Sequence, residues 1–335
     1  MTDAAGRRKR ILSGMRPTGR LHLGNLVGAL ANWRALQTEY DCFFMIADYH
    51  ALMSDYEKPG GIAAASLEVM TDFLACGLDP ETSAIFRQSD VPEHAELHLI
   101  LSAYTPIAWL ERNPTYKEQM QQLTSKDIHN YAFLGYPVLQ AADIVIYKAD
   151  LVPVGEDQLP HLELAREVVR RFNSILGKDV LVEPQAKLTQ AARLLGLDRR
   201  KMSKSYGNQI DLADSPEVIR KKVLSMITDP KRIRLADAGH PDECNVCQWY
   251  KIFSPAESDD VADKCAHSKW GCTDCKKRLA EVLVAYLAEP RARRTELEAH
   301  PEKVLELLHA GAAKARPVAR AVLDEVKELV GLGKL

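Results

Sequence analysis

The chain has 335 residues, of which 46% are hydrophobic and 27% are charged. This length predicts two domains with enough buried core to fold without disulfide staples, and the composition excludes long disorder, fibres and coiled coils. The 44 Lys and Arg and the 46 Asp and Glu leave a net charge of -2. Any polyanion must therefore be bound by a local basic patch.

The sequence has no apolar run near the roughly 20 residues that a membrane-spanning helix needs, and its first residues, MTDAAGRRKR, are not followed by a secretory signal. We therefore expect a cytoplasmic protein with no membrane partner. Of the seven cysteines, all but Cys42 and Cys76 lie between positions 244 and 275. In a reducing compartment, such a cluster indicates metal ligation before disulfides.

The first half of the sequence alternates short β-branched or aromatic runs with longer amphipathic runs. This pattern is typical of a parallel sheet covered by helices. Residues 26–38 and 61–76 are expected to be two of those helices. The expected strands are residues 10–14, 41–48, 83–88, 151–154 and 180–182.

After about residue 214 the strand signals stop, and helices are expected at residues 215–227, 276–287 and 301–330. We therefore predict an α/β fold with two domains. Residues 1–205 would form a doubly wound, parallel-sheet, Rossmann-like catalytic domain. Residues 206–335 would form an all-helical domain whose C-terminal helix packs back on the catalytic domain.

A candidate anion-binding turn follows the first expected strand. It reads Pro17-Thr18-Gly19-Arg20-Leu21-His22-Leu23-Gly24-Asn25 and precedes an amphipathic helix. Free backbone N–H groups and the helix dipole make such a turn a site for anions. A tight turn in which His22 only caps or packs is the alternative, and this segment alone leaves both open.

A second motif, Lys201-Met202-Ser203-Lys204-Ser205, combines two lysines with neighbouring hydroxyls. A cationic loop of this kind suits the charge that builds up on a transferring phosphate. A solvated basic loop is the alternative, but this pentapeptide should occur by chance in only about 1 in 10,000 chains of this length. The motif therefore predicts phosphate chemistry.

In this order, His22-Leu23-Gly24-Asn25 and Lys201-Met202-Ser203-Lys204-Ser205 resemble the two signatures of class I aminoacyl-tRNA synthetases. Residues 136–143 and 152–158 resemble segments of the tryptophanyl-tRNA synthetase family, and the likeness runs from about residue 11 to residue 335. It implies a homodimeric ligase that activates L-tryptophan with ATP and Mg²⁺ and transfers it to tRNA(Trp), with residues 206–335 as the domain that binds the tRNA anticodon. Two rivals stay open, a tyrosine-specific homologue and a non-catalytic, metal-containing RNA-binding protein.

The resemblance also implies residue roles for ATP, with His22, Lys201 and Lys204 as the catalytic groups. The tryptophan carboxylate is already ionised, so its attack on the α-phosphate needs alignment and cations, and no general base. Lys117 is a further candidate phosphate contact, and an exposed helix lysine is the alternative. Besides the two lysines of the second motif, the expected ATP contacts are Arg16, Pro17, Thr18, Gly24, Asn25, Gly155, Glu156, Asp157, Met202, Ser203 and Ser205.

Asp143 is expected to recognise the indole ring, since the indole N–H only donates and an ionised carboxylate only accepts hydrogen bonds. It lies in the apolar run 141–146, which favours a pocket acid over a surface acid or helix cap. Phe would leave this acid unsatisfied, whereas pocket shape must exclude tyrosine. The other implied tryptophan contacts are Gly14, His50, Tyr136, Gln140 and Gln158, with Leu12 as an aliphatic neighbour of the indole.

The cysteine cluster offers four thiolates, Cys244, Cys265, Cys272 and Cys275. Such a set suits tetrahedral Zn²⁺ or an iron–sulfur cluster, and the spacing does not decide between them. Cys247 competes with Cys244 for the fourth place. The resemblance to bacterial tryptophanyl-tRNA synthetases with a similar Pro-Asp-Glu-Cys segment favours a 4Fe-4S cluster and a free Cys247.

A run of basic residues surrounds the last three cysteines and is expected to contact the tRNA backbone. His267 and Trp270 lie within the run and offer rings for stacking on bases, with Trp270 in the core as the alternative. The arginines at positions 7–10 are expected to form a solvated tail. The basic residues of the run are Lys264, Lys269, Lys276, Lys277 and Arg278.

Overall fold

The structure is a computed structural model that describes residues 2, 6–57, 59–114, 116–117, 130–188 and 194–333. Its first half contains a five-stranded, fully parallel sheet with strand order β3-β2-β1-β4-β5. The predicted α/β fold class is therefore confirmed. The strands are β1 (Arg10–Met15), β2 (Asp41–Ile46), β3 (Ser83–Arg87), β4 (Leu151–Val154) and β5 (Gln185–Leu188).

The sheet is covered on both faces, as its apolar strands require. In β2, Cys42, Phe44 and Ile46 belong to one buried core, whereas Phe43 and Met45 belong to a second core on the other face. A continuous apolar strand of this kind is typical of a parallel sheet that lies between two layers of helices.

The fifth strand was predicted in the wrong place. Val180 and Leu181 are buried but form a loop, because their N–H groups donate to the side-chain oxygen of Asn173 at 3.3 and 3.2 Å. The Asn173 amide donates in turn to the carbonyl of Leu181 at 2.9 Å. The strand forms a few residues later, at Gln185–Leu188, where the sequence lacks a strong β signal.

The arginines at positions 7–10 do not form a solvated tail. Arg10 begins β1, and its backbone N–H donates to the Asp150 carboxylate at 2.7 Å, while Arg7 contacts the same carboxylate at 3.0 Å. Arg10 also pairs with Asp41 at 3.2 Å. These charges therefore fix the start of the first strand.

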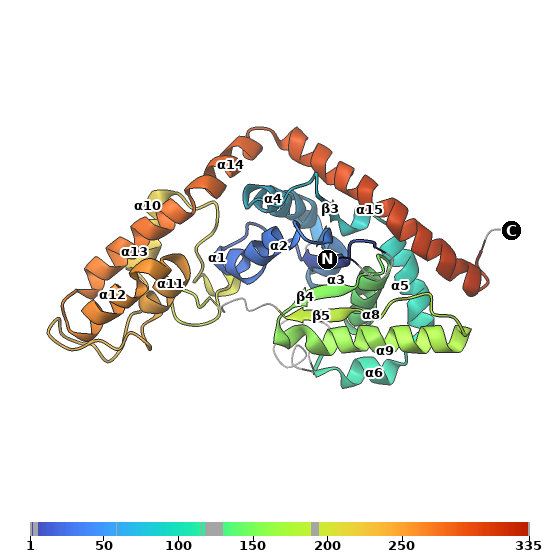
Figure 1. Ribbon diagram of the computed structural model, residues 1–335, viewed down its shortest axis with the longest axis horizontal. Helices are drawn as coiled ribbons and strands as arrows, with labels where there is room; N and C mark the ends of the chain where they lie inside the picture. Colours follow the sequence, from blue (N-terminus) through green and yellow to red (C-terminus); the bar gives the residue numbers. More distant parts are fainter. Residues whose placement is uncertain are drawn as a thin grey trace.

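The helices of the first half cover both faces of the sheet (Figure 1). Their bounds confirm the helices expected at 26–38 and 61–76, with a π-helical turn at the start of the former. They are α1 (Leu23–Asn25), the π turn Leu26–Leu30, α2 (Ala31–Leu36), α3 (Asp48–Asp55), α4 (Ile62–Ala75), α5 (Glu93–Tyr104), α6 (Ile107–Arg112), α8 (Tyr131–Val145) and α9 (Leu159–Leu176), with short 3₁₀ turns at Pro59–Gly61, Gln88–Asp90 and Glu156–Gln158.

The second half of the described chain is helical, as expected, and lies beside the sheet in Figure 1. The buried core on one face of the sheet continues into this part and includes Trp249 and Leu279. The expected domain boundary between residues 205 and 206 stays a prediction. The elements are the 3₁₀ turn Lys204–Tyr206, α10 (Pro216–Leu224), α11 (Asn245–Phe253), α12 (Pro255–Ala266), α13 (Cys272–Tyr286), α14 (Ala288–Glu298) and α15 (Pro301–Leu329).

The last helix, α15, runs back along the sheet and lies against β3 and α5 (Figure 1). Gly311 permits this close packing, because a Cβ at that position would lie 1.8 Å from the backbone oxygen of Ile85 in β3. Farther along α15, Ala315 and Ala319 are buried in the second core. No helix among the described residues has both the length and the apolar character needed to cross a bilayer.

Candidate active site

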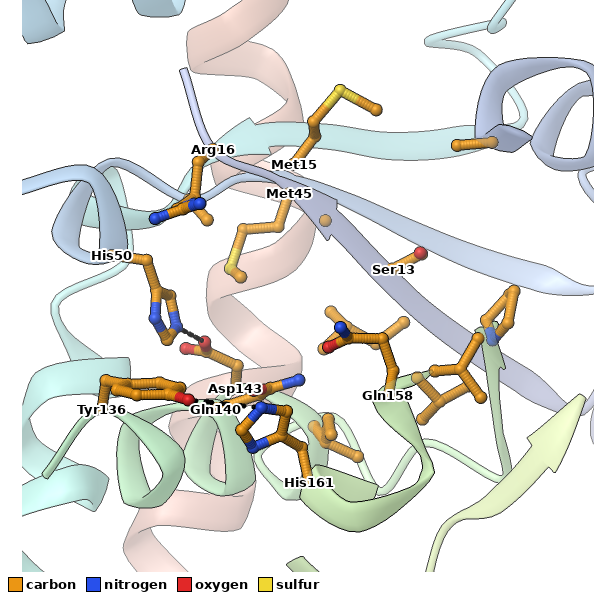
Figure 2. Close-up of a pocket in the computed structure, with 18 of the residues that line it drawn as sticks. Ser13, Met15, Arg16, Met45, His50, Tyr136, Gln140, Asp143, Gln158 and His161 are labelled. Atoms are coloured by element: carbon orange, nitrogen blue, oxygen red, sulfur yellow. Dashed lines mark hydrogen bonds and ion pairs between the residues drawn. The ribbon is translucent and has the colours of Figure 1, made fainter. Parts of the chain in front are cut away.

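A cavity with a volume of about 490 Å³ opens at the carboxyl ends of β1 and β4. Ligands of doubly wound sheets bind in a crevice at this edge. Figure 2 shows side chains from β1, α3, α8 and α9 facing this space. The cavity contains every residue expected to bind tryptophan, namely Gly14, His50, Tyr136, Gln140, Asp143 and Gln158, together with Leu12, Arg16 and Gly155.

Asp143, on α8, is 1% exposed and accepts three hydrogen bonds. Gln88 and His94 both donate to Oδ1 at 2.7 Å, whereas His50 contacts Oδ2 at 2.7 Å. Burial alone would raise the pKa of Asp143, but the hydrogen bonds from His50 and His94 hold it well below its usual range. The group is therefore an ionised carboxylate at neutral pH, which buried acids become only when they are well paired.

The chain of hydrogen bonds continues behind Asp143 into the core. His94 is fully buried, and its Nε2 lies 2.8 Å from the hydroxyl of Tyr147. Since the carboxylate only accepts, His94 Nδ1 carries a proton, and Nε2 is the ring nitrogen that faces the Tyr147 hydroxyl. Tyr147 stacks on Phe43 of β2 with ring centroids 4.5 Å apart. The acid is thus fixed from behind by packed rings.

The same cavity is lined by a second polar pair. The hydroxyl of Tyr136 lies 3.3 Å from Nε2 of His161, which is 4% exposed. On its other side, His161 Nδ1 lies 3.3 Å from the Asn113 amide. Burial raises the pKa of Tyr136 to about 12, so its hydroxyl stays protonated and able to donate.

The two phosphate motifs meet beside this cavity. Nζ of Lys204 donates to the backbone oxygen of Thr18 at 2.9 Å. The N–H of Gly24 points to Sδ of the buried Met202 at 3.3 Å. A Cβ on Gly24 would lie 2.9 Å from His22 Nδ1, so any other residue here would force the His22 ring to shift. The fold therefore brings the two signatures together.

Burial and the nearby charge of Lys204 lower the pKa of His22 from 6.5 to about 4. His22 is therefore neutral at physiological pH and can only serve as a hydrogen-bond partner. Partial burial also lowers the pKa of Lys204, while Asp211, Asp72 and Glu68 act in the opposite direction. Lys204 remains the cation at this end of the site, because its usual pKa is near 10.

The other predicted ATP residues differ in exposure. Lys201 and Glu156 are exposed, and Pro17 is buried. Lys117 is exposed and helical, as the alternative predicted, and it is not among the described residues that line the cavity. The side chain of Asp157 lies outside the described part of the structure. The roles of the remaining members, Arg16, Asn25, Gly155, Ser203 and Ser205, stay predictions.

The predicted metal ligands Cys244, Cys265, Cys272 and Cys275 line one cavity, and Cys247 lines it with them. The cavity volume is about 10 Å³, the room that one water molecule takes. A zinc ion needs four donors at about 2.0–2.3 Å from one point. In the described ranges, no group of three or more His, Cys, Asp or Glu side chains is placed to hold a metal ion. The structure therefore gives no support to the predicted zinc or iron–sulfur centre.

The expected basic patch is largely neutralised by acids of the same region of the chain. Trp270 packs against the core and lines the cysteine cavity, and His267 pairs with Asp263 at 3.0 Å. The alternative of a core Trp270 therefore describes this region better than a stacking platform. The ion pairs are Lys264–Asp260, Lys269–Asp263, Lys277–Asp274 and Arg278–Glu257, and Lys276 donates to the Leu224 carbonyl.

Residues 4–288 match the family described as tRNA synthetases class I (W and Y). The chain is 47% identical over 326 residues to the tryptophan–tRNA ligase of Thermotoga maritima. This alignment covers 96% of the chain and 99% of that ligase. The chain belongs to this family. The tryptophan–tRNA ligase of Aquifex aeolicus is 39% identical to this class I synthetase. The alignment covers 96% of this chain and 100% of that ligase.

Solved structures of class I synthetases agree with this assignment. The crystal structure of tryptophanyl-tRNA synthetase from Campylobacter jejuni complexed with ADP and tryptophan has a TM-score of 0.87 and 34% identity, covering 96% of this chain and 100% of that chain. A tyrosyl-tRNA synthetase from Archaeoglobus fulgidus complexed with L-tyrosine has a TM-score of 0.65 at 24% identity, a likeness that shows the shared fold alone.

Sequence reasoning missed several residues that build the site of this synthetase. Gln88 follows β3 directly, and the rule that ligands bind beyond the carboxyl ends of parallel strands could have found it. His94 and His161 lie on helices without a local signal. Asn208 follows the second motif and is 3% exposed, with its side-chain oxygen accepting from the Ser203 N–H at 2.8 Å.

Proposed function

We propose that this class I synthetase is a tryptophan–tRNA ligase. It activates L-tryptophan with ATP to tryptophanyl-adenylate and pyrophosphate, and then transfers tryptophan to the 3′ end of tRNA(Trp) with release of AMP. Relatives that carry this name span nearly the whole chain. ATP, L-tryptophan and tRNA(Trp) are therefore the substrates, Mg²⁺ would accompany ATP, and the cytoplasm and a homodimer are the expected location and assembly.

The observation that carries the choice of tryptophan over Phe is the acceptor count at Asp143. An ionised carboxylate offers about four acceptor positions, two on each oxygen. His94 and Gln88 fill those on Oδ1, whereas Oδ2 takes only the contact from His50 among the described residues. One acceptor position therefore remains on Oδ2, beside the cavity. The single N–H of indole satisfies it, and the ring of Phe does not.

The chemistry at the other end follows from charge. A carboxylate oxygen of tryptophan bonds to the α-phosphorus of ATP while the bond to the oxygen that bridges the α- and β-phosphates breaks. Negative charge then gathers on the departing pyrophosphate. Lys204, with Lys201, supplies the positive charge that stabilises it. His22 and the N–H groups of Gly24 and Asn25 orient the phosphates.

Two residue sets complete this assignment as proposals. Arg16, Pro17 and Thr18 would border ATP through their backbone, and Gly155, Glu156 and Asp157 would line its nucleoside. Met202, Ser203 and Ser205 would hold the lysine loop in place. The amino acid would be held by Tyr136, Gln140 and Gln158 around its ammonium and carboxylate groups, with Gly14 leaving room for the ring.

We further propose, on the resemblance alone, that Cys244, Cys265, Cys272 and Cys275 hold a 4Fe-4S cluster. Soft thiolates are the ligands that such a cluster takes, and the four residues share one cavity. The cavity must widen to admit it. Anaerobically purified protein should contain iron and sulfide in equal amounts, and the exchange of Cys247 for Ser should not change them. Colourless protein without iron and sulfide would reject this proposal.

The function is tested by tryptophan-dependent exchange of pyrophosphate with ATP, followed by charging of tRNA(Trp). We expect kcat/KM for tryptophan in this exchange to be at least about 100 times that for tyrosine or phenylalanine. Faster exchange with tyrosine would favour the tyrosine-specific alternative. No exchange with any amino acid would favour a non-catalytic RNA-binding protein.

A further inference from the structure

A buried arginine of the helical half reaches the nucleotide end of the sheet. Arg294, on α14, has a side chain that is 3% exposed. Its guanidinium donates to Asp72 and Glu68, both on α4, and Nη2 lies 3.1 Å from Glu298 on its own helix. One side chain thus joins two helices that are far apart in sequence.

The partner acid connects this arginine with the first phosphate motif. Asp72 is fully buried, and its Oδ2 accepts a hydrogen bond from the backbone N–H of Leu21 at 2.7 Å. Leu21 directly precedes His22. The two oxygens of one carboxylate therefore hold the Arg294 guanidinium on one side and the backbone of the ATP motif on the other.

The second phosphate motif is tied to the same backbone. The Leu212 N–H donates to the carbonyl of Leu21 at 2.9 Å, and the Leu23 N–H donates to the carbonyl of Ile210 at 2.9 Å. Residues 210–212 follow the second motif, Lys201-Met202-Ser203-Lys204-Ser205, by a few positions. A shift of the Leu21 amide would therefore move both the turn that carries His22 and the segment that anchors Lys204.

A buried ion pair is weak support for a purely stabilising role, because the desolvation of two charges offsets much of their attraction. At this position the pair instead fixes a hydrogen-bond acceptor at one backbone amide. Burial raises the pKa of Asp72 to about 6, and Arg294 opposes this rise. The carboxylate therefore relies on the arginine to stay charged and in place.

We infer that Arg294 is a positioning residue for ATP, through which the helical half of the chain sets the place of the first phosphate motif. It holds Asp72, and Asp72 holds the Leu21 amide. The inference rests on the proposed function, since it takes ATP as the ligand of that motif. It predicts that loss of Arg294 harms the nucleotide end of the site and spares the tryptophan end.

The test uses Arg294→Met in the full-length chain, with Arg320→Met as the matched control. Arg320, on α15, also reaches a fully buried acid of the first half, Glu93, at 2.5 Å, but this pair lies away from the phosphate motifs. Calorimetric titration with a non-hydrolysable ATP analogue and, separately, with tryptophan gives the two affinities. We expect the Kd of the analogue to rise about tenfold in Arg294→Met. The Kd of tryptophan in that variant, and the Kd of the analogue in Arg320→Met, should stay within about twofold of wild type.

Arg294→Lys keeps the charge and serves if the methionine variant does not fold. Lysine lacks the fork that bonds two acids at once, so an intermediate rise of about threefold in the Kd of the analogue is expected. Unchanged affinity for the analogue in a folded variant would overturn the inference, as would an equal loss of affinity for both ligands. These titrations need no turnover, so failure of wild-type exchange would reject the proposed function without deciding this point.

Discussion

The two ends of the active site are built in different ways. At the tryptophan end, Asp143 is buried, accepts three hydrogen bonds and is backed by His94 and the stacked ring of Tyr147. At the phosphate end, Lys204 is part of a short 3₁₀ turn and bonds to the backbone oxygen of Thr18. The first end is a fixed part of the core, and the second is a contact between two loops.

This difference explains how one end discriminates between amino-acid rings and how the other end follows the charge on the phosphates. A fixed carboxylate with one open acceptor position favours a ring that donates to it over a ring that has no donor. A lysine on a loop can give up the Thr18 carbonyl for the phosphates of ATP and follow the charge as it moves to pyrophosphate. Changes at the two ends should therefore have separable effects.

The largest effect is expected from Lys204→Ala. Removing one preorganised cation should lower the rate of tryptophan-dependent exchange by about 100- to 1,000-fold. The Kd of tryptophan in the absence of ATP should not change, because Lys204 contacts the other motif. Steady-state exchange and fluorescence titration measure the two quantities, and exchange within threefold of wild type would remove Lys204 from the mechanism.

A smaller loss is expected from Asp143→Asn at the tryptophan end. Hydrogen bonds to a charged group contribute about 1.5–3 kcal/mol, so kcat/KM for tryptophan should fall about 10- to 150-fold. Discrimination against Phe should fall with it, while KM for ATP stays the same. The exposed acid Glu163, changed to Gln, provides the control. Unchanged kcat/KM values for tryptophan and Phe would mean that Asp143 lies outside the tryptophan site.

The support behind Asp143 is tested by Tyr147→Phe. The change leaves Nε2 of the buried His94 without its partner, which should lower the free energy of unfolding by about 1–3 kcal/mol. The Kd of tryptophan should rise a few-fold and that of an ATP analogue should stay constant. Urea unfolding and calorimetry measure these values. Tyr40→Phe, in the other core, is the control, and a similar rise in the Kd of tryptophan there would show that the network has no special role.

The smallest effect concerns pH at the phosphate end. Because the pKa of His22 falls to about 4 on folding from 6.5 in the unfolded chain, only the unfolded chain takes up this proton between those values. His22 therefore makes the free energy of unfolding fall as pH falls from about 6.5 toward 4. His22→Gln should lose less stability than wild type between pH 7 and pH 5 in urea unfolding. Equal losses would show that His22 is not protected from protonation.

The sequence predicted most of the strands, but only some of the residues that build the site. The strands at 10–14, 83–88 and 151–154 were predicted within two residues because parallel strands buried on both faces have a strong apolar signal. Strand β5 was missed because, of the described strands, β4 alone pairs with it, and its short sequence includes the polar residues Gln185 and Lys187. Asp143 stood out as an acid in an apolar run. Its partner His94 did not, since a contact between two separate helices leaves no local pattern.

The cysteine region shows the limit of spacing as a guide. Sequence placed Cys244 and Cys275 in one cluster, and they do line one cavity. Spacing could not show that Cys247 lies in the same cavity, nor that the volume there is about 10 Å³. It also could not show that acids of α12, such as Glu257 and Asp263, neutralise the neighbouring basic run.

The separation of the two ends is tested most directly by one set of calorimetric titrations, in which wild type, Lys204→Ala and Asp143→Asn each bind tryptophan and a non-hydrolysable ATP analogue. We predict that Asp143→Asn weakens tryptophan at least about tenfold and leaves the analogue within about twofold of wild type. Lys204→Ala should weaken the analogue at least about tenfold and leave the affinity for tryptophan within about twofold of wild type. If either variant weakens both ligands by similar factors, the two ends are not independent and this account of the site is wrong.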